Sequence, residues 1–149
     1  MTPKLFTIEK ARETLPLVQQ ITRDIVDSHL ILEGLKDTVR KESRRFSRFK
    51  IDELEQSGQH SKRIQDQRNS LEKRLLGLKK ELQTLGCALL DGPRGVIGYP
   101  GFLGNELVHY CWLYGETDIA SFCRGRDSYK KRQPIPNVES TSTPQSERG

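Results

Sequence analysis

This 149-residue chain has no long apolar run. Its first ten residues, MTPKLFTIEK, contain nothing typical of a signal peptide, and no later segment has the roughly 20 consecutive apolar residues that span a membrane. We therefore expect a cytoplasmic location and no membrane partner. The three cysteines are an odd number, and in a reducing compartment they are expected to be thiols.

Hydrophobic residues are also scarce, at 34% of the chain, whereas charged residues make up 30%. This composition is too polar for a compact globule with a thick core, and it favours long helices that expose most of their surface. The formal charge is +5. Most of the basic excess lies in one run, RKESRRFSRFK, at residues 40–50.

The first half of the chain has the hydrophobic repeat of packed helices. Thr7 is expected to cap a short first helix, with Phe6 as a staple residue before it, and Pro16 is expected to start a second, longer helix. The polar residues 55–62, which include Gly58, are interpreted as the turn before the next helix. The core positions of the two long helices are Val18, Ile21, Ile25, Ser28, Leu32, Leu35, Val39, Glu42, Phe46 and Phe49, then Ile64, Arg68, Leu71, Leu75, Leu78, Leu82 and Leu85. Gly86 stands at the expected helix end.

Two such seams joined by a short polar turn predict a long antiparallel helical hairpin, similar to a coiled coil, over residues 1–86. Each seam is one stripe wide, so the hairpin alone leaves apolar surface partly open. A homodimer with four helices would cover that surface. We therefore expect a protein that acts in protein–protein interaction and associates with itself through its helices.

The composition changes after the second helix, where short apolar runs alternate with glycine-rich turns over residues 87–136. This pattern predicts a small antiparallel sheet of three or four strands. With the hairpin it would form one α+β domain over residues 1–136. Residues 137–149 are rich in Ser, Thr, Pro, Gln and Glu, and are expected to be disordered.

The segment VHYCWLYGETDIASFC brings His109, Cys111 and Cys123 together. If its loop is residues 116–118, Cys111 lies opposite Cys123 and all three residues share a face of the sheet. They could then form a small metal site or a thiol–histidine catalytic pair. A structural zinc site needs four ligands, however, and Cys87 would have to supply the fourth. We therefore favour buried structural thiols, and expect Trp112 and the cysteines of this segment to help dock the sheet on the helices. We expect no metal, no cofactor and no catalytic residue, and consider an enzyme less favoured.

Basic residues form two patches, at 40–50 and 124–132, that could contact a nucleic-acid backbone. Phe46 and Phe49 could stack on bases there, but they also fit the helix seam. The contact candidates are Arg44, Arg45, Arg48, Lys130, Lys131 and Arg132. A nucleic-acid- or ribosome-associated protein is the alternative interpretation, and it needs both patches on one face.

Four segments resemble the motifs of one protein family. KLFTIEKARETLPLV, LGCALLDGPRGVIGYPG, YCWLYGETDI and SYKKRQPI are similar to bacterial and archaeal domain-of-unknown-function family 2203 over about residues 4–136, as a divergent member. The matching residues, which would line any family pocket, are Cys111, Trp112, Gly115, Glu116, Arg132 and Pro134. The family tends to have Asp where this chain has Gly98 and His where it has Cys123, so the resemblance implies the fold more than any chemistry. An ion pair between Glu116 and Arg132 is expected to hold the C-terminal segment.

Overall fold

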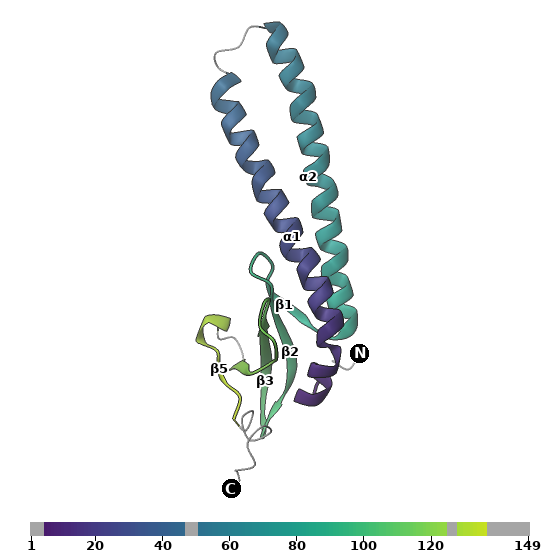
Figure 1. Ribbon diagram of the computed structural model, residues 1–149, viewed down its shortest axis with the longest axis vertical. Helices are drawn as coiled ribbons and strands as arrows, with labels where there is room; N and C mark the ends of the chain where they lie inside the picture. The colour runs from purple at the N-terminus through teal and green to yellow at the C-terminus, as the bar shows by residue number, and fades with distance from the viewer. Residues whose placement is uncertain (1–4, 47–50, 125–127, 137–149) are drawn as a thin grey trace.

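The computed structural model describes residues 5–46, 51–124 and 128–136, without the side chains of residues 42–57 and 59. Its elements are α1 (Ile8–Phe46), α2 (Ile51–Leu85), β1 (Ala88–Asp91), β2 (Val96–Leu103), β3 (Glu106–Leu113), β4 (Ser121–Arg124), the 3-10 helix η1 (Tyr129–Lys131) and β5 (Gln133–Pro134). The two helices form a long antiparallel hairpin, and the sheet packs beside the base of this hairpin (Figure 1). The predicted α+β layout is therefore confirmed. The expectation of disorder for residues 137–149 falls outside the described residues.

The first helix begins where the sequence predicts but is longer than expected. Thr7 caps it, because its Oγ1 accepts a hydrogen bond from the backbone N–H of Lys10 at 3.1 Å. Pro16 does not start a second helix, since it lies inside α1. A proline removes one helical hydrogen bond, but Leu15 and Val18 on either side of it are buried. This burial keeps the helix continuous through the proline.

The boundary between the two helices differs from the predicted position. The first helix ends at Phe46 and the second begins at Ile51, with residues 47–50 outside the described part of the chain. Residues 55–62 are helical, so the turn predicted there is wrong. A glycine inside a helix costs only about 1 kcal/mol relative to alanine, and Gly58 is therefore tolerated. Neither described helix contains a stretch that is long and apolar enough to cross a lipid bilayer.

The two helices touch along the predicted seams. The buried seam residues are Val18, Ile21, Ile25, Ser28 and Leu32 on α1, and Ile64, Leu78 and Leu82 on α2. On α1, burial decreases toward the far end of the hairpin, where Leu35 and Val39 are only half-buried. Gly86 ends α2 as predicted, with a positive φ of 95°.

The sheet has five strands in the order β1-β2-β3-β4-β5, and every neighbouring pair is antiparallel. The prediction of three or four strands is therefore one strand short. The missed strand is β5, which has only two residues and includes Pro134. Such a short segment has no periodic pattern that would reveal it in the sequence.

One face of the sheet, which we call the inner face, packs on the hairpin base. Its side chains alternate along the strands, and they join residues of both helices in one core cluster. The inner-face members of this cluster are Ile97, Tyr99, Val108, Tyr110, Trp112 and Phe122. Trp112 is 1% exposed, and its Nε1–H donates to the backbone oxygen of Glu116 at 2.9 Å. Trp112 therefore helps to dock the sheet on the helices, as the sequence predicts.

The segment before α1 is fastened to β2. The backbone N–H of Phe6 donates to the backbone oxygen of Pro100 at 2.8 Å. The Phe6 ring also meets the Tyr99 ring edge to face, with centroids 5.1 Å apart. Gly101 permits this approach, because a Cβ there would lie against the backbone oxygen of Phe6 and 2.6 Å from the Tyr110 ring.

Replacing Gly101 by alanine should destabilise the protein by about 1–3 kcal/mol, since the added methyl group has no space. The control Gly34→Ala on α1 adds a methyl group with no atom within 4 Å, and should stabilise the protein by about 0.5–1 kcal/mol. Urea unfolding followed by circular dichroism measures both changes. Equal stability of the two variants would contradict the close approach of Phe6 to β2.

Candidate functional site

The face of the sheet away from the helices, which we call the outer face, carries the predicted thiol–histidine group. His109 pairs with Cys123, and Cys111 pairs with Ser121. The three predicted residues therefore share one face, but the prediction that Cys111 lies directly opposite Cys123 is wrong. The observed pairing is shifted by two residues from the predicted one, so that Cys123 lies opposite His109.

The two thiols of this group are diagonal neighbours on β3 and β4. Their Sγ atoms lie 3.1 Å apart, and both side chains are buried. Burial raises the pKa of the Cys111 thiol, and the hydrogen bond with Cys123 raises it further. Burial also lowers the pKa of His109, which favours the neutral imidazole. A thiol with a raised pKa is a poor nucleophile and a poor metal ligand at neutral pH, so the arrangement supports a structural role for the cysteines.

A four-ligand metal site would require Cys87 on the outer face. Cys87 instead lies in the core cluster between sheet and helices, near Tyr99. Within residues 5–46, 51–124 and 128–136, no group of three or more His, Cys, Asp or Glu side chains is arranged to hold a metal ion. The cysteines are therefore divided between the two faces, and Cys111 and Cys123 do not dock the sheet on the helices.

The C-terminal segment, residues 128–136, forms a strap that continues from η1 into the edge strand β5 beside β4. Its η1 part lies on the side of the sheet away from the helices (Figure 1). Arg132 donates to both carboxylate oxygens of Glu116, at 3.2 and 2.8 Å, which is the predicted ion pair. Glu116 also accepts a hydrogen bond from the backbone N–H of Leu113 at 3.0 Å. The carboxylate is therefore fixed at the end of β3 and holds the strap from there.

Tyr129 ties the other part of the strap to the turn between β1 and β2. Its hydroxyl donates to Oδ2 of Asp91 at 2.7 Å and accepts from Nη1 of Arg94 at 2.7 Å. Burial acts to raise the pKa of Asp91, but the hydrogen bonds from Tyr129 and the Arg94 amide together lower it. Sequence reasoning missed this triad because Tyr129 is far from Asp91 along the chain.

The positions at which the resemblance expects Asp and His lie close together on the outer face. Gly98 is the partner of Cys111 on β2, and the sulfur of Cys123 lies 3.1 Å from that of Cys111. Leu90 and the His109 ring occupy the space above Gly98, because a Cβ there would lie 3.0 Å from Leu90 and 3.1 Å from the ring. Trp112, by contrast, is on the inner face. The matching residues of the family are thus divided between the two faces.

The remaining matching residues belong to the turn after β3 and to the strap. Gly115 has a positive φ of 102°, which a residue with a side chain adopts only under strain. Pro134 lies in β5 and pairs with Ser121. Both residues therefore shape the backbone around the Glu116–Arg132 ion pair.

The described parts of the two predicted nucleic-acid patches lie far apart. Lys130 and Lys131 are exposed in η1, whereas Arg132 is occupied by Glu116. Outside the described side chains are Arg44, Arg45 and Arg48. The end of α1 that carries the helical patch lies at the tip of the hairpin, and η1 lies beside the sheet (Figure 1). The two patches therefore do not form one continuous track along the described surface.

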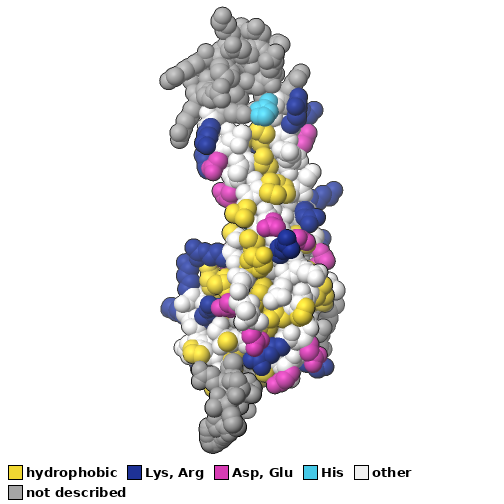
Figure 2. Space-filling model, in the orientation of Figure 1, with side chains coloured by type: hydrophobic (Ala, Val, Ile, Leu, Met, Phe, Trp, Pro, Cys, Tyr) yellow, Lys and Arg dark blue, Asp and Glu magenta, His cyan; other side chains and the backbone are white. Residues whose placement is uncertain are grey.

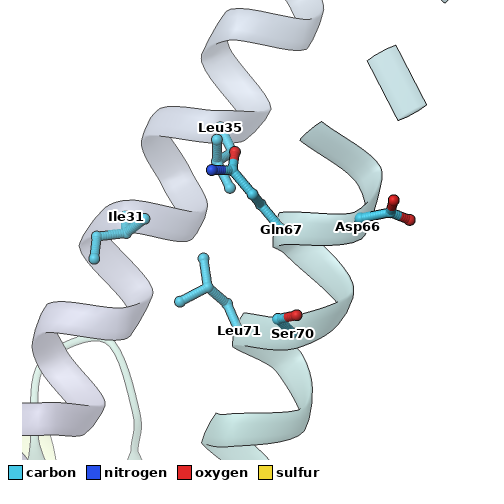
Figure 3. A pocket seen from close by; sticks show the side chains of 6 residues that line it. All are labelled: Ile31, Leu35, Asp66, Gln67, Ser70 and Leu71. Atoms are coloured by element: carbon cyan, nitrogen blue, oxygen red, sulfur yellow. The ribbon is translucent and has the colours of Figure 1, made fainter. Parts of the chain in front are cut away.

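Two apolar grooves between the helices were not predicted. The upper groove, nearer the hairpin tip, has a volume of about 400 Å³ and is lined by Ile31, Leu35, Asp66, Gln67, Ser70 and Leu71. In Figure 3 the Leu71 side chain points into the space between the helices, whereas Asp66 points away from it. The lower groove, of about 400 Å³, is lined by residues that include Leu17, Ile21, Gly77, Lys80, Glu81 and Leu85.

Both grooves open on the same side of the hairpin. Leu17 and Ile31 are about four helical turns apart on α1, so they lie on one side of that helix. Between the grooves, Arg74 forms an ion pair with Asp24 at 3.5 Å. Figure 2 shows a stripe of hydrophobic side chains along the hairpin with charged side chains beside it. We call the two grooves and this ion pair the open face.

The open face leaves large apolar side chains in water. Leu17 is 49% exposed and Ile31 is 55% exposed. The sheet covers a different side of α1, where Thr22 and Val26 approach Gly95. The sequence did contain a signal for the open face. Apolar residues stand beside the heptad seam as well as in it, so the apolar stripe is wider than one seam.

The sequence matches one family model, described as Uncharacterized conserved protein (DUF2203), over residues 4–135. Neither the search of curated proteins nor the search of solved structures returned a match. The family match agrees with the resemblance carried by the short motifs. The cytoplasmic location stays a prediction.

One buried thiol and two buried tyrosine hydroxyls predict a loss of stability at alkaline pH. Burial raises the pKa of Cys111, Tyr99 and Tyr110, so the folded chain holds these protons more firmly than the unfolded chain does. Each group contributes fully to the free energy of unfolding below the pKa that it has in the unfolded chain. This contribution is lost as the pH rises above that pKa. The melting temperature should fall above about pH 9, the ordinary pKa of Cys, and less steeply in Cys111→Ala. An identical pH dependence for both proteins would contradict this account.

We expect the Glu116–Arg132 ion pair to protect the two outer-face thiols, Cys111 and Cys123, from reagents in solution. Glu116→Gln should speed alkylation of Cys111 and Cys123 by iodoacetamide about tenfold. A charged pair of this kind contributes about 1–2 kcal/mol to holding the strap on the sheet, and its loss would expose the thiols more often. Peptide mass spectrometry over time measures the rates. The control Glu106→Gln removes a carboxylate that pairs with Arg124 on the surface, and should leave the rates unchanged. Equal rates in both variants would show that the strap does not shield the thiols.

Proposed function

Because the chain belongs to the family described as Uncharacterized conserved protein (DUF2203), and because that description assigns no activity, we propose a function from the geometry of the structure. The protein acts in protein–protein interaction without enzymatic activity, and it forms a homodimer through the open face of its hairpin. The observation that carries this proposal is the pair of apolar grooves on the side of the helices that no other described element covers. Exposed apolar surface that is bordered by charged residues is typical of interaction sites.

A four-helix arrangement supports this proposal. Helices in such bundles pack around a shared core and bury apolar residues from two or more sides. In the single chain, the seam residues Leu71 and Leu85 are only half-buried, and each lines one of the two grooves. A second hairpin placed on the open face would complete their burial.

The state of the reactive groups supports a function without catalysis. Burial disfavours the thiolate of Cys111, and Asp91 is occupied by hydrogen bonds from Tyr129 and Arg94. Glu116 is likewise occupied by Arg132. Each of these groups therefore serves to hold the sheet and its strap together.

Adjacent residues provide a matched test. Ile31 lines the upper groove and is 55% exposed, whereas Leu30 is 67% exposed and does not line either groove. Ile31→Glu should weaken the dimer at least tenfold, since a charge would be buried without a partner. Leu30→Glu should leave the dimer unchanged. Analytical ultracentrifugation across micromolar concentrations measures both, and circular dichroism confirms that both variants fold.

Two results would contradict the proposal. An unmodified protein that stays monomeric throughout this range would exclude dimerisation at the open face, and equal effects of the two substitutions would exclude the groove as its site. A monomer that binds nucleic acid with an affinity that falls as salt increases would instead support the alternative function.

A further inference from the structure

The two edges of the open face carry opposite charges. On α1, Asp24 and Asp27 are three residues apart and therefore lie on one side of the helix. On α2, Arg74 bridges to Asp24, and Lys80 lines the lower groove. Lys73 is two helical turns before Lys80 and so lies on the same side. Asp66 and Glu81 of α2 also line the grooves. With the three basic residues Lys73, Arg74 and Lys80 against these two acids, the α2 edge is basic overall, whereas the α1 edge is acidic overall.

Asp27 and Lys73 lie at the same level along the hairpin. Asp27 is between Asp24 and Ile31 on α1, and Lys73 is between Arg74 and Ser70 on α2. Asp24 pairs with Arg74, and Ile31 shares a groove with Ser70, so the intervening residues are also level. They form no ion pair with each other in one chain, because they stand on opposite outer edges of the open face.

Neither residue has a strong partner among the side chains that the structure describes. Asp27 forms one ion pair, with Arg23 one turn earlier at 4.0 Å, and both side chains are more than half exposed. Lys73 forms no ion pair among the described residues. Both charges are therefore available to a molecule that lies on the open face.

A second hairpin can lie on this face in two symmetric orientations. If the hairpin tips are at the same end, α1 of each copy lies on α2 of the other. If the tips are at opposite ends, α1 lies on α1 and α2 lies on α2. The first orientation places the acidic edge on the basic edge, and the second places like charges together.

Resting on the homodimer proposed above, we infer that the partner of the open face is a second copy of this chain, with both hairpin tips at the same end. The two-fold axis runs parallel to the helices, and the same surface of both copies is used. Asp27 of each copy faces Lys73 of the other. The two Asp24–Arg74 pairs meet at the centre, where each carboxylate lies between two guanidinium groups.

The grooves fit this orientation. The lower groove of one copy lies on the lower groove of the other, so Leu17 of one chain approaches Leu85 of its second copy. The upper grooves meet in the same way, with Ile31 near Leu71. The sheets do not obstruct this contact, because each sheet packs on a different side of α1.

Charge reversal tests the orientation. Lys73→Asp and Asp27→Lys should each raise the dimer dissociation constant about tenfold, because two attractive pairs become repulsive in the dimer. The double variant should return close to the unmodified value, as should an equimolar mixture of the two single variants. The increase in the dissociation constant caused by each single substitution should be smaller at high ionic strength, since exposed charges are screened. Sedimentation of the full chain at low and high salt measures them.

The control is Lys79→Asp, which makes the same charge change on the side of α2 away from the open face and should have no effect. If the unmodified protein is a dimer that Lys73→Asp strengthens or leaves unchanged, the tips lie at opposite ends and this inference fails while the proposed homodimer stands. If the unmodified protein is a monomer, both fail.

Discussion

The contact between α1 and the inner face of the sheet determines how the rest of the molecule is arranged. Trp112 and Tyr99 are fully buried in this contact, together with Ile25 of the helix. One side of α1 is thereby covered by the sheet, and a second side is covered by α2. The third side stays in water, and because it carries Leu17 and Ile31 it defines the open face. The proposed dimer follows from this unequal coverage of one long helix.

The same contact explains why the reactive residues lie where they do. Since the inner face is filled largely by aromatic residues, the thiol–histidine group of His109, Cys111 and Cys123 lies on the outer face, where Arg132 of the strap is near Cys111. Glu116 and Tyr129 hold this strap through ion-pair and hydrogen-bond partners. The outer face is thus closed by polar contacts, whereas the hairpin has apolar surface left to bury. The side of the molecule that is available for a partner is therefore the helical one.

Local patterns in the sequence were sufficient for the helical hairpin and for four of the five strands, and they indicated the Glu116–Arg132 pair. Heptad spacing identified the seam because side chains three and four residues apart share a side of a helix. The position of the turn at residues 55–62 was wrong because a polar stretch with one glycine can continue a helix. The register of Cys111 was wrong because the loop is set by Glu116, which folds back onto β3. The open face depends on which side of α1 the sheet covers, and that contact joins distant parts of the chain.

The central claim is that two hairpins bind through their open faces with their tips at the same end. A spin label at a cysteine that replaces Lys41, an exposed residue far along α1, reports the orientation through pulsed dipolar spectroscopy. Lys41 lies about 25 Å along the helix from Asp24, at 1.5 Å per residue. The account predicts one distance below about 30 Å between the labels of the two copies. A distance of about 50 Å would place the tips at opposite ends, and the absence of any dipolar coupling would contradict the dimer itself.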